Sequence, residues 1–253
     1  MQLTLEMYLI VCPLVALAGF VDSIAGGGGL ISLPAYYLAG LSPSVAAGTN
    51  KMSAFMGTSL ATYNYARSGR IDSRIGIVSG LAAIPGSMLG VAVMGLLPDQ
   101  AIRIMVTCCL PVVAVFTLRG HAKERERRIL TDVQTAVISF LIGLAIGFYD
   151  GLVGPGTGTF LILLFVQFFG LDDITASGTA KVPNLMSNIA ALASFFINGN
   201  VLWLLGLPAG LCSIAGAALG TRLTIRKGSK FIRGMMLVVL ILLLVKMITD
   251  MLQ

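Results

Sequence analysis

Charged residues are scarce in this chain of 253 residues: only 11% are Asp, Glu, Lys or Arg. A soluble domain carries about 25% charged residues. The few charged residues of this chain could not cover the surface of a soluble fold. Histidine occurs once, at His121, and the four cysteines lack the spacing of metal ligands. Four cysteines are too few for a disulfide scaffold. A single histidine in a basic loop makes a Ser-His-Asp enzyme an unsuitable interpretation. We expect neither a catalytic residue nor a metal or other cofactor.

Apolar residues, in contrast, make up 57% of the chain and recur in long runs. The runs are 7–24, 28–41, 44–66, 75–97, 99–118, 132–153, 156–170, 174–197, 201–221 and 231–251. A membrane-spanning helix needs about 20 apolar residues. The pattern predicts an all-α polytopic membrane protein with about eight to ten transmembrane segments, folded as one membrane domain over 1–253.

The basic residues give the expected topology. Most of them fall in three short connections, at 67–74, 119–128 and 222–233. Short cytoplasmic loops carry an excess of Lys and Arg, and alternating crossings place all three connections on one side. We therefore interpret the net charge of +6 as a topology signal and not as a nucleic-acid site. The prediction is N-out and C-out, with the lipid bilayer as partner. The oligomeric state stays open, a homo-oligomer included.

Two of the apolar runs, 28–41 and 156–170, are too short to span comfortably as straight helices. Each follows a glycine-rich stretch, at 26–29 and 154–158. Consecutive glycines make a poor helix interior, at about 1 kcal/mol each relative to Ala. We expect non-helical backbone there, leading into half-helices or re-entrant hairpins, which membranes tolerate only inside protein or beside a wet cavity.

The two halves of the chain align with each other. Residues 19–22 match 147–150, the glycine-rich stretches match, and the sequence around Lys51 matches the sequence around Lys181. The basic connection at 67–74 corresponds to an uncharged connection at 198–200, so equivalent loops face opposite sides. We predict two inverted repeats, about 7–118 and 132–253, joined by a cytoplasmic loop at 119–131. Such repeats with paired, interrupted helices are typical of secondary transporters.

Lys51 and Lys181 are the sharpest functional signal, because each lies in an apolar run away from the basic loops. A charged lysine inside a membrane costs about 2.5–3.5 kcal/mol. Either lysine could instead extend along its stem to the interface. Because the two occupy matching positions behind Gly-Thr, we favour a shared anion site. Its expected residues add backbone N–H groups and polar side chains to the lysines: Gly27, Gly28, Thr49, Asn50, Lys51, Gly156, Thr157, Thr179, Lys181, Asn184 and Asn188.

Some of these residues have structural alternatives. Asp22 and Asp150 are paired acids that could carry protons, cap the glycine-rich turns or pair with the lysines. Asn184 and Asn188 share a helix face and could line a cavity or join neighbouring helices. The glycine-rich stretches could present helix N-termini to an anion or serve close helix packing.

Four segments carry a family resemblance: GFVDSIAGGGG (19–29), AGTNK (47–51), FYDGLVGPGTGT (148–159) and SGTAK (177–181). They resemble the sulfite exporter TauE/SafE family, over nearly the whole chain. Many members have Ser where this chain has Asn50 or Ala180. The resemblance implies transport of small, often sulfur-containing anions such as sulfite or sulfonates across a bacterial or archaeal inner membrane.

Three classes of function remain open at this point. The favoured one is a secondary transporter that moves a small, sulfur-containing anion by alternating access. An anion channel would carry the same solute without saturation. A membrane enzyme or assembly scaffold would carry no flux, and the absence of a catalytic constellation disfavours it.

Overall fold

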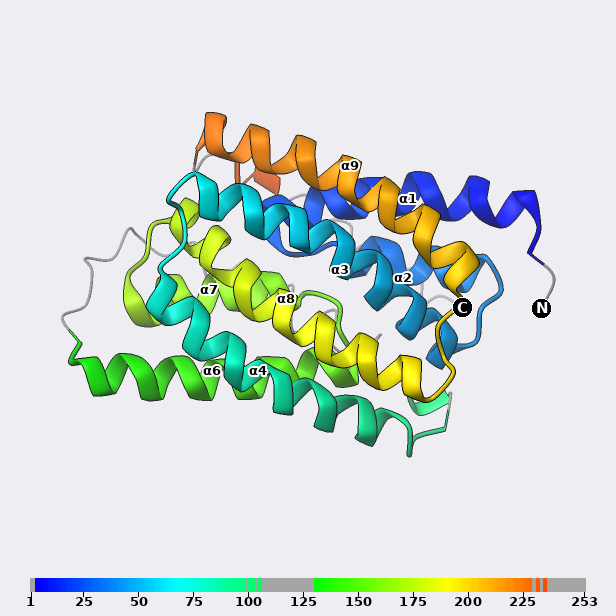
Figure 1. Cartoon of the computed structure of the whole chain (residues 1–253), viewed down its shortest axis with the longest axis horizontal. Coiled ribbons are helices and arrows are strands. Elements are labelled where there is room, and N and C mark those ends of the chain that lie inside the picture. The colour runs from blue at the N-terminus through cyan, green and yellow to red at the C-terminus, as the bar shows by residue number, and fades with distance from the viewer. Residues whose placement is uncertain are drawn as a thin grey trace.

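The computed structural model describes residues 3–98, 100–102, 104–105, 130–228, 231–232 and 234–235. Within them the secondary structure is entirely helical (Figure 1): α1 Leu5–Ala25, α2 Gly29–Leu38, α3 Pro43–Arg67, α4 Ser73–Met94, α6 Asp132–Leu152, α7 Thr157–Phe169, α8 Asp173–Ile197 and α9 Trp203–Lys227. Most of the predicted segments 99–118 and 231–251, and most of the loop 119–131, lie outside the described residues.

Four of the described helices are long and apolar enough to cross a membrane: α1, α4, α6 and α9. Helices α3 and α8 have 25 residues each, but they are less apolar because they carry the polar side chains discussed below. The larger number of spans that the sequence predicts stays a prediction. The multi-helical, all-α character is confirmed.

The two predicted helix breaks are confirmed. Helix α1 ends at Ala25 and α2 begins at Gly29, while α6 ends at Leu152 and α7 begins at Thr157. At 1.5 Å per residue, the 10 residues of α2 and the 13 of α7 extend about 15 and 20 Å. Both are therefore too short to cross a hydrocarbon core of about 30 Å.

One boundary differs clearly from prediction. Helix α9 continues to Lys227, six residues past the predicted end at residue 221. The apolar run ends there because charges begin, but Arg and Lys are good helix formers. Arg226 and Lys227 in the last turn also complement the negative end of the helix dipole. Hydropathy marks where the chain leaves an apolar environment, not where its helix ends.

The long helices lie alongside one another in two similar groups (Figure 1). Helix α1 packs on α9, α4 packs on α6, and α3 and α8 contact each other between them. The helix pairs approach closely through glycine: a Cβ added to Gly216 would overlap the carbonyl oxygen of Ala16, and one on Gly147 would lie 2.5 Å from that of Ala83. Small residues of this kind allow helix backbones to touch in membranes.

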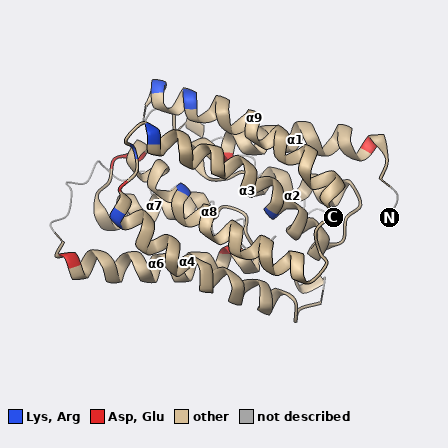
Figure 2. Ribbon diagram, in the orientation of Figure 1, with Lys and Arg blue, Asp and Glu red and all other residues tan. Residues whose placement is uncertain are grey.

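The two ends of the bundle differ in their basic residues. Figure 2 shows the described Lys and Arg residues outside the core gathered at one end, where α3 meets α4 and where α9 finishes. They are Arg67, Arg70, Arg74, Arg222, Arg226 and Lys227. Glu6 lies in the first turn of α1, near the N-terminus at the opposite end.

Candidate functional site

The two helix breaks meet inside the bundle. Gly26 has a left-handed backbone, with φ of 77°, and it ends α1. A Cβ added to Gly26 would overlap the backbone of Gly158, and one on Gly158 would lie 2.6 Å from the Gly26 Cα atom. The end of α1 therefore lies directly against the start of α7, and only glycine at both positions permits this contact.

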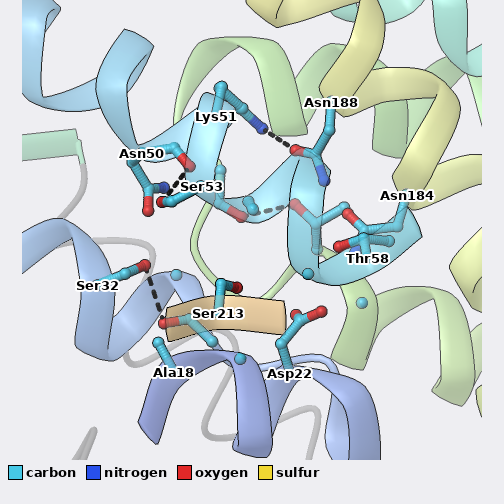
Figure 3. A pocket seen from close by; sticks show the side chains of 18 of the residues that line it. Ala18, Asp22, Ser32, Asn50, Lys51, Ser53, Thr58, Asn184, Asn188 and Ser213 are labelled. Carbon is cyan, nitrogen blue, oxygen red and sulfur yellow. Dashed lines mark hydrogen bonds between the residues drawn. The ribbon is translucent and has the colours of Figure 1, made fainter. Parts of the chain in front are cut away.

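A pocket of about 550 Å³, including its opening, lies at this junction. Its walls come from α1, α2, α3, α6, α7, α8 and α9 and from both glycine-rich breaks. The polar or charged residues among its lining are Asp22, Ser32, Asn50, Lys51, Ser53, Thr58, Asp150, Thr157, Asn184, Asn188 and Ser213. In Figure 3, Lys51, Asn50 and Ser53 extend from α3 on one side, and Asp22 and Ser213 lie across the pocket.

Lys51 reaches this pocket from the middle of α3. Its Nζ atom lies 2.6 Å from Asp150 Oδ1 and donates to Asn188 Oδ1 at 3.2 Å. The lysine and aspartate side chains are only 7% and 3% exposed. The Asp150 carboxylate also accepts from Thr157 Oγ1 at 2.8 Å and from Ser187 Oγ at 2.6 Å. Lys51 and Asp150 thus form a buried ion pair whose carboxylate is fully hydrogen-bonded.

Lys181 forms the second buried ion pair, with Asp22. Its Nζ atom lies 3.2 Å from Asp22 Oδ2 and also donates to the Asp22 backbone carbonyl. Lys181 is fully buried, while the Asp22 side chain is 20% exposed. The lysine of each half of the chain therefore pairs with the aspartate of the other half.

These pairs settle two of the alternatives left open by the sequence. The interpretation that the lysines extend to the membrane interface is wrong for both, since their ammonium groups lie inside the protein. Of the roles considered for the acids, pairing with the lysines is present in the structure. A buried charge without a partner is costly. Each lysine can therefore be buried inside the bundle only because its aspartate is buried beside it.

The structure divides the predicted site residues into two groups. Nine line the pocket: Asp22, Gly28, Asn50, Lys51, Asp150, Gly156, Thr157, Asn184 and Asn188. Gly27, Thr49, Thr179 and Lys181 are not part of its lining. The Oγ1 atoms of the two threonines accept instead from backbone N–H groups in loops at the bundle ends, Thr49 from Leu202 at 3.0 Å and Thr179 from Asp72 at 2.9 Å.

Several lining residues were not singled out from the sequence. Thr58 and Gly57 line the pocket together with Asn50, and their spacings of i+7 and i+8 from Asn50 place them on one face of α3. That face could have been found by extending the helical periodicity from Asn50. Ser213 gave no such signal, because α9 is otherwise apolar or glycine-rich in this region.

The half-helices, the buried ion pairs and the polar pocket among apolar helices define a multi-pass membrane protein with an internal polar site. The sulfite exporter TauE/SafE family model matches residues 11–247. The chain belongs to this family, whose members are membrane transporters and not enzymes.

Curated relatives agree with this assignment. The chain is 35% identical over 235 residues to the "Probable membrane transporter protein ORF9" of Sinorhizobium sp, covering 92% of this chain and 89% of the relative. It is 36% identical over 238 residues to YfcA of Escherichia coli strain K12, a probable membrane transporter protein, covering 92% and 87%. A Haemophilus influenzae relative with the same description is 31% identical over 253 residues, covering 99% and 98%. No solved structure matches the chain.

Proposed function

We propose that the protein is a secondary transporter that moves a small anion of the sulfite or sulfonate type by alternating access, and that the anion binds in the central pocket. The observation that carries this proposal is that the starts of two half-helices and the Lys51 ammonium group line the same cavity. The first N–H groups of a helix have no intrahelical partner, and the positive end of its dipole favours anions.

The charge balance of the pocket refines this proposal. The two lysines and two aspartates cancel in pairs, so the attraction for an anion depends on N–H and ammonium donors and not on surplus charge. Lys51 has three N–H donors, of which Asp150 and Asn188 take two. No third partner is present among the residues that the structure describes, so this N–H group is available to a ligand, and Asn184 and Asn188 add amide groups beside it.

Matched contacts support an inverted repeat as the basis of alternating access. Thr49 and Thr179 hold equivalent loops at opposite ends, and the lysine–aspartate pairs cross between the halves. Two related halves that meet around one central site could rock against each other and open it to either side.

The basic end of the bundle would face the cytoplasm. That orientation places the N-terminus outside, in the inner membrane of a bacterial cell. An inside-negative potential then drives each negative charge outward by about 2.3 kcal/mol per 100 mV. Export is therefore the favoured direction, and uptake would need coupling, for which Asp22 and Asp150 are the candidate proton carriers.

Flux measurements in proteoliposomes test the proposal. Uptake of radiolabelled sulfite should saturate with concentration, and Lys51→Met should reduce it more than tenfold. Ser59→Ala is a matched control on the same helix, because its hydroxyl donates to the Phe55 carbonyl and does not line the pocket. Wild-type flux in Lys51→Met would exclude this site, and a current that follows the potential without saturating would favour a channel.

A further inference from the structure

The two aspartates of the pocket differ in how completely they are hydrogen-bonded. Both oxygens of Asp150 are engaged, Oδ1 by Lys51 and Thr157 and Oδ2 by Ser187. Asp22 Oδ2 faces Lys181, but Asp22 Oδ1 has no hydrogen-bond partner among the residues that the structure describes. Asp22 is also the more exposed of the two, at 20% against 3%. One carboxylate oxygen is therefore open to the pocket.

The sequence explains this difference in the register of the predicted repeat. Gly29 stands where the second half has Thr157, and Gly57 stands where it has Ser187. Glycine has no hydroxyl, so neither bond to the carboxylate can form on the Asp22 side. A side chain could not be accommodated at Gly57 without movement, because its Cβ would overlap Ser213 Oγ.

The open carboxylate and the Lys51 ammonium group lie on different walls of the pocket. Figure 3 shows Asp22 on α1 and Lys51 on α3, with the pocket between them. One wall thus offers N–H donors to an anionic group, and the other offers an acceptor with a negative charge. A ligand that satisfies both walls has an anionic head at one end and a hydrogen-bond donor at the other.

We propose that the transported solute has an anionic head and, at its far end, a hydrogen-bond donor, preferably an ammonium group that makes the solute a zwitterion, and that Asp22 binds this donor. The inference rests on the proposed function and deepens it. An anion without a donor would displace water from Asp22 and return no hydrogen bond, which leaves a buried acceptor unsatisfied. It would also bring like charges together. Sites built to hydrogen-bond a donor reject analogues that lack it.

Three sulfonates with the same head test the inference: ethanesulfonate, 2-hydroxyethanesulfonate and 2-aminoethanesulfonate. Binding to the purified full chain at pH 7 is measured by calorimetry. The amino compound should bind at least tenfold more tightly than ethanesulfonate, with the hydroxy compound between them. Equal affinity for all three compounds, or binding of none of them, would overturn the inference. The proposed function would stand in either case, because the sulfite flux in proteoliposomes tests it separately.

Substitutions then assign the preference to Asp22. Asp22→Asn should bring the amino compound and ethanesulfonate to within about twofold of each other, because the charge that favours the ammonium group is gone. Asp150→Asn, the matched variant, should weaken all three ligands alike. If Asp22→Asn fails to fold because Lys181 is left unpaired, Asp22→Asn/Lys181→Gln removes the pair together. An unchanged preference in a folded Asp22 variant would refute the assignment.

Discussion

The two buried lysine–aspartate pairs have the same residues in matching sequence contexts, yet the bundle treats them differently. Lys51 lines the pocket and shares its ammonium group between Asp150 and Asn188. Lys181 lies behind the pocket wall and is fully buried against Asp22. In the first pair the lysine is accessible and the carboxylate is saturated; in the second the lysine is enclosed and the carboxylate is partly open.

This difference shows how two similar sequence segments can build an asymmetric site. Both groups that remain accessible from the pocket come from the first half, and the second half neutralises them. The pocket therefore presents an ammonium group from the first half on α3 and a carboxylate, also from the first half, on α1. The second half contributes their counterions, together with Asn184 and Asn188.

Replacing a buried lysine should give the largest loss in the free energy of unfolding, and the loss should differ between the two ion pairs. Lys181→Met leaves Asp22 charged beside an apolar side chain, and breaking a buried pair in this way costs about 3–5 kcal/mol. Lys51→Met should cost less, because Thr157 and Ser187 still hold Asp150. The free energy of unfolding in detergent measures both. Equal losses would contradict the distinction between an enclosed and an accessible lysine.

A substitution at the contact between the two helix breaks should give the second-largest loss of stability. Gly26→Ala places a Cβ at a left-handed residue, which costs about 1–2 kcal/mol, and also forces that atom against Gly158. Gly69 is the matched control, since its φ of 68° is similar and a Cβ there meets nothing within 4 Å. Thermal unfolding should show Gly26→Ala clearly below Gly69→Ala; similar midpoints would mean that the breaks do not press together.

Removing the serine that completes Asp150 should make the two carboxylates more alike. Ser187→Ala deletes the bond to Asp150 Oδ2 and leaves a buried charged acceptor short of a partner, at a cost of about 1–3 kcal/mol. Ser194→Ala on the same helix, where the hydroxyl donates to the Ala190 carbonyl, is the control. Denaturant unfolding that ranks the two variants equally would argue against a special role for Ser187.

The helix caps offer the smallest contrast between the halves. Asp172 accepts from the N–H groups of Ile174 and Thr175 at the start of α8, whereas Ser42 caps α3 without a side-chain bond. Asp172→Ala should cost about 1 kcal/mol, and Ser42→Ala should cost clearly less. Both costs are measured as losses in the free energy of unfolding at pH 7.

The cap of α8 also predicts a pH dependence. Burial raises the pKa of the Asp172 carboxyl, but hydrogen bonds from Thr175 and Ile174 and the charge of Arg70 outweigh it, so this pKa lies below its usual value of 3.8. A lowered folded-state pKa stabilises above the unfolded pKa, and this contribution disappears as the pH falls through the folded value. The gap between wild type and Asp172→Ala should therefore close in acid; a constant gap would mean that the charge is irrelevant.

Much of the fold could be predicted because the signals are local. The glycine-rich stretches identified both helix breaks, since each glycine in a helix interior costs about 1 kcal/mol relative to Ala wherever it occurs. The apolar runs located the helices α1 to α4 and α6 to α9 to within a few residues, except for the end of α9. The position of Lys51 in an apolar run likewise indicated a buried charge.

The exact role of each polar residue could not be predicted, because it depends on how a helix is rotated about its axis. Thr49 precedes Lys51 by only two residues, yet its hydroxyl faces the loop at Leu202 while the lysine reaches the pocket. The sequence assigned both to the same site. A difference of two positions turns a side chain by about 200° around an α-helix, and only packing decides which direction is inward.

The sequence alone determined that this chain is a membrane protein, where its helices break and which charged residues have no place in lipid. These properties follow from composition and backbone preference, which act residue by residue. Only the tertiary structure decided that each lysine pairs with the aspartate of the other half and that Asp22 keeps an open oxygen. The paired residues are 99 and 159 positions apart in the sequence, and the distances between them are set only once the helices have packed.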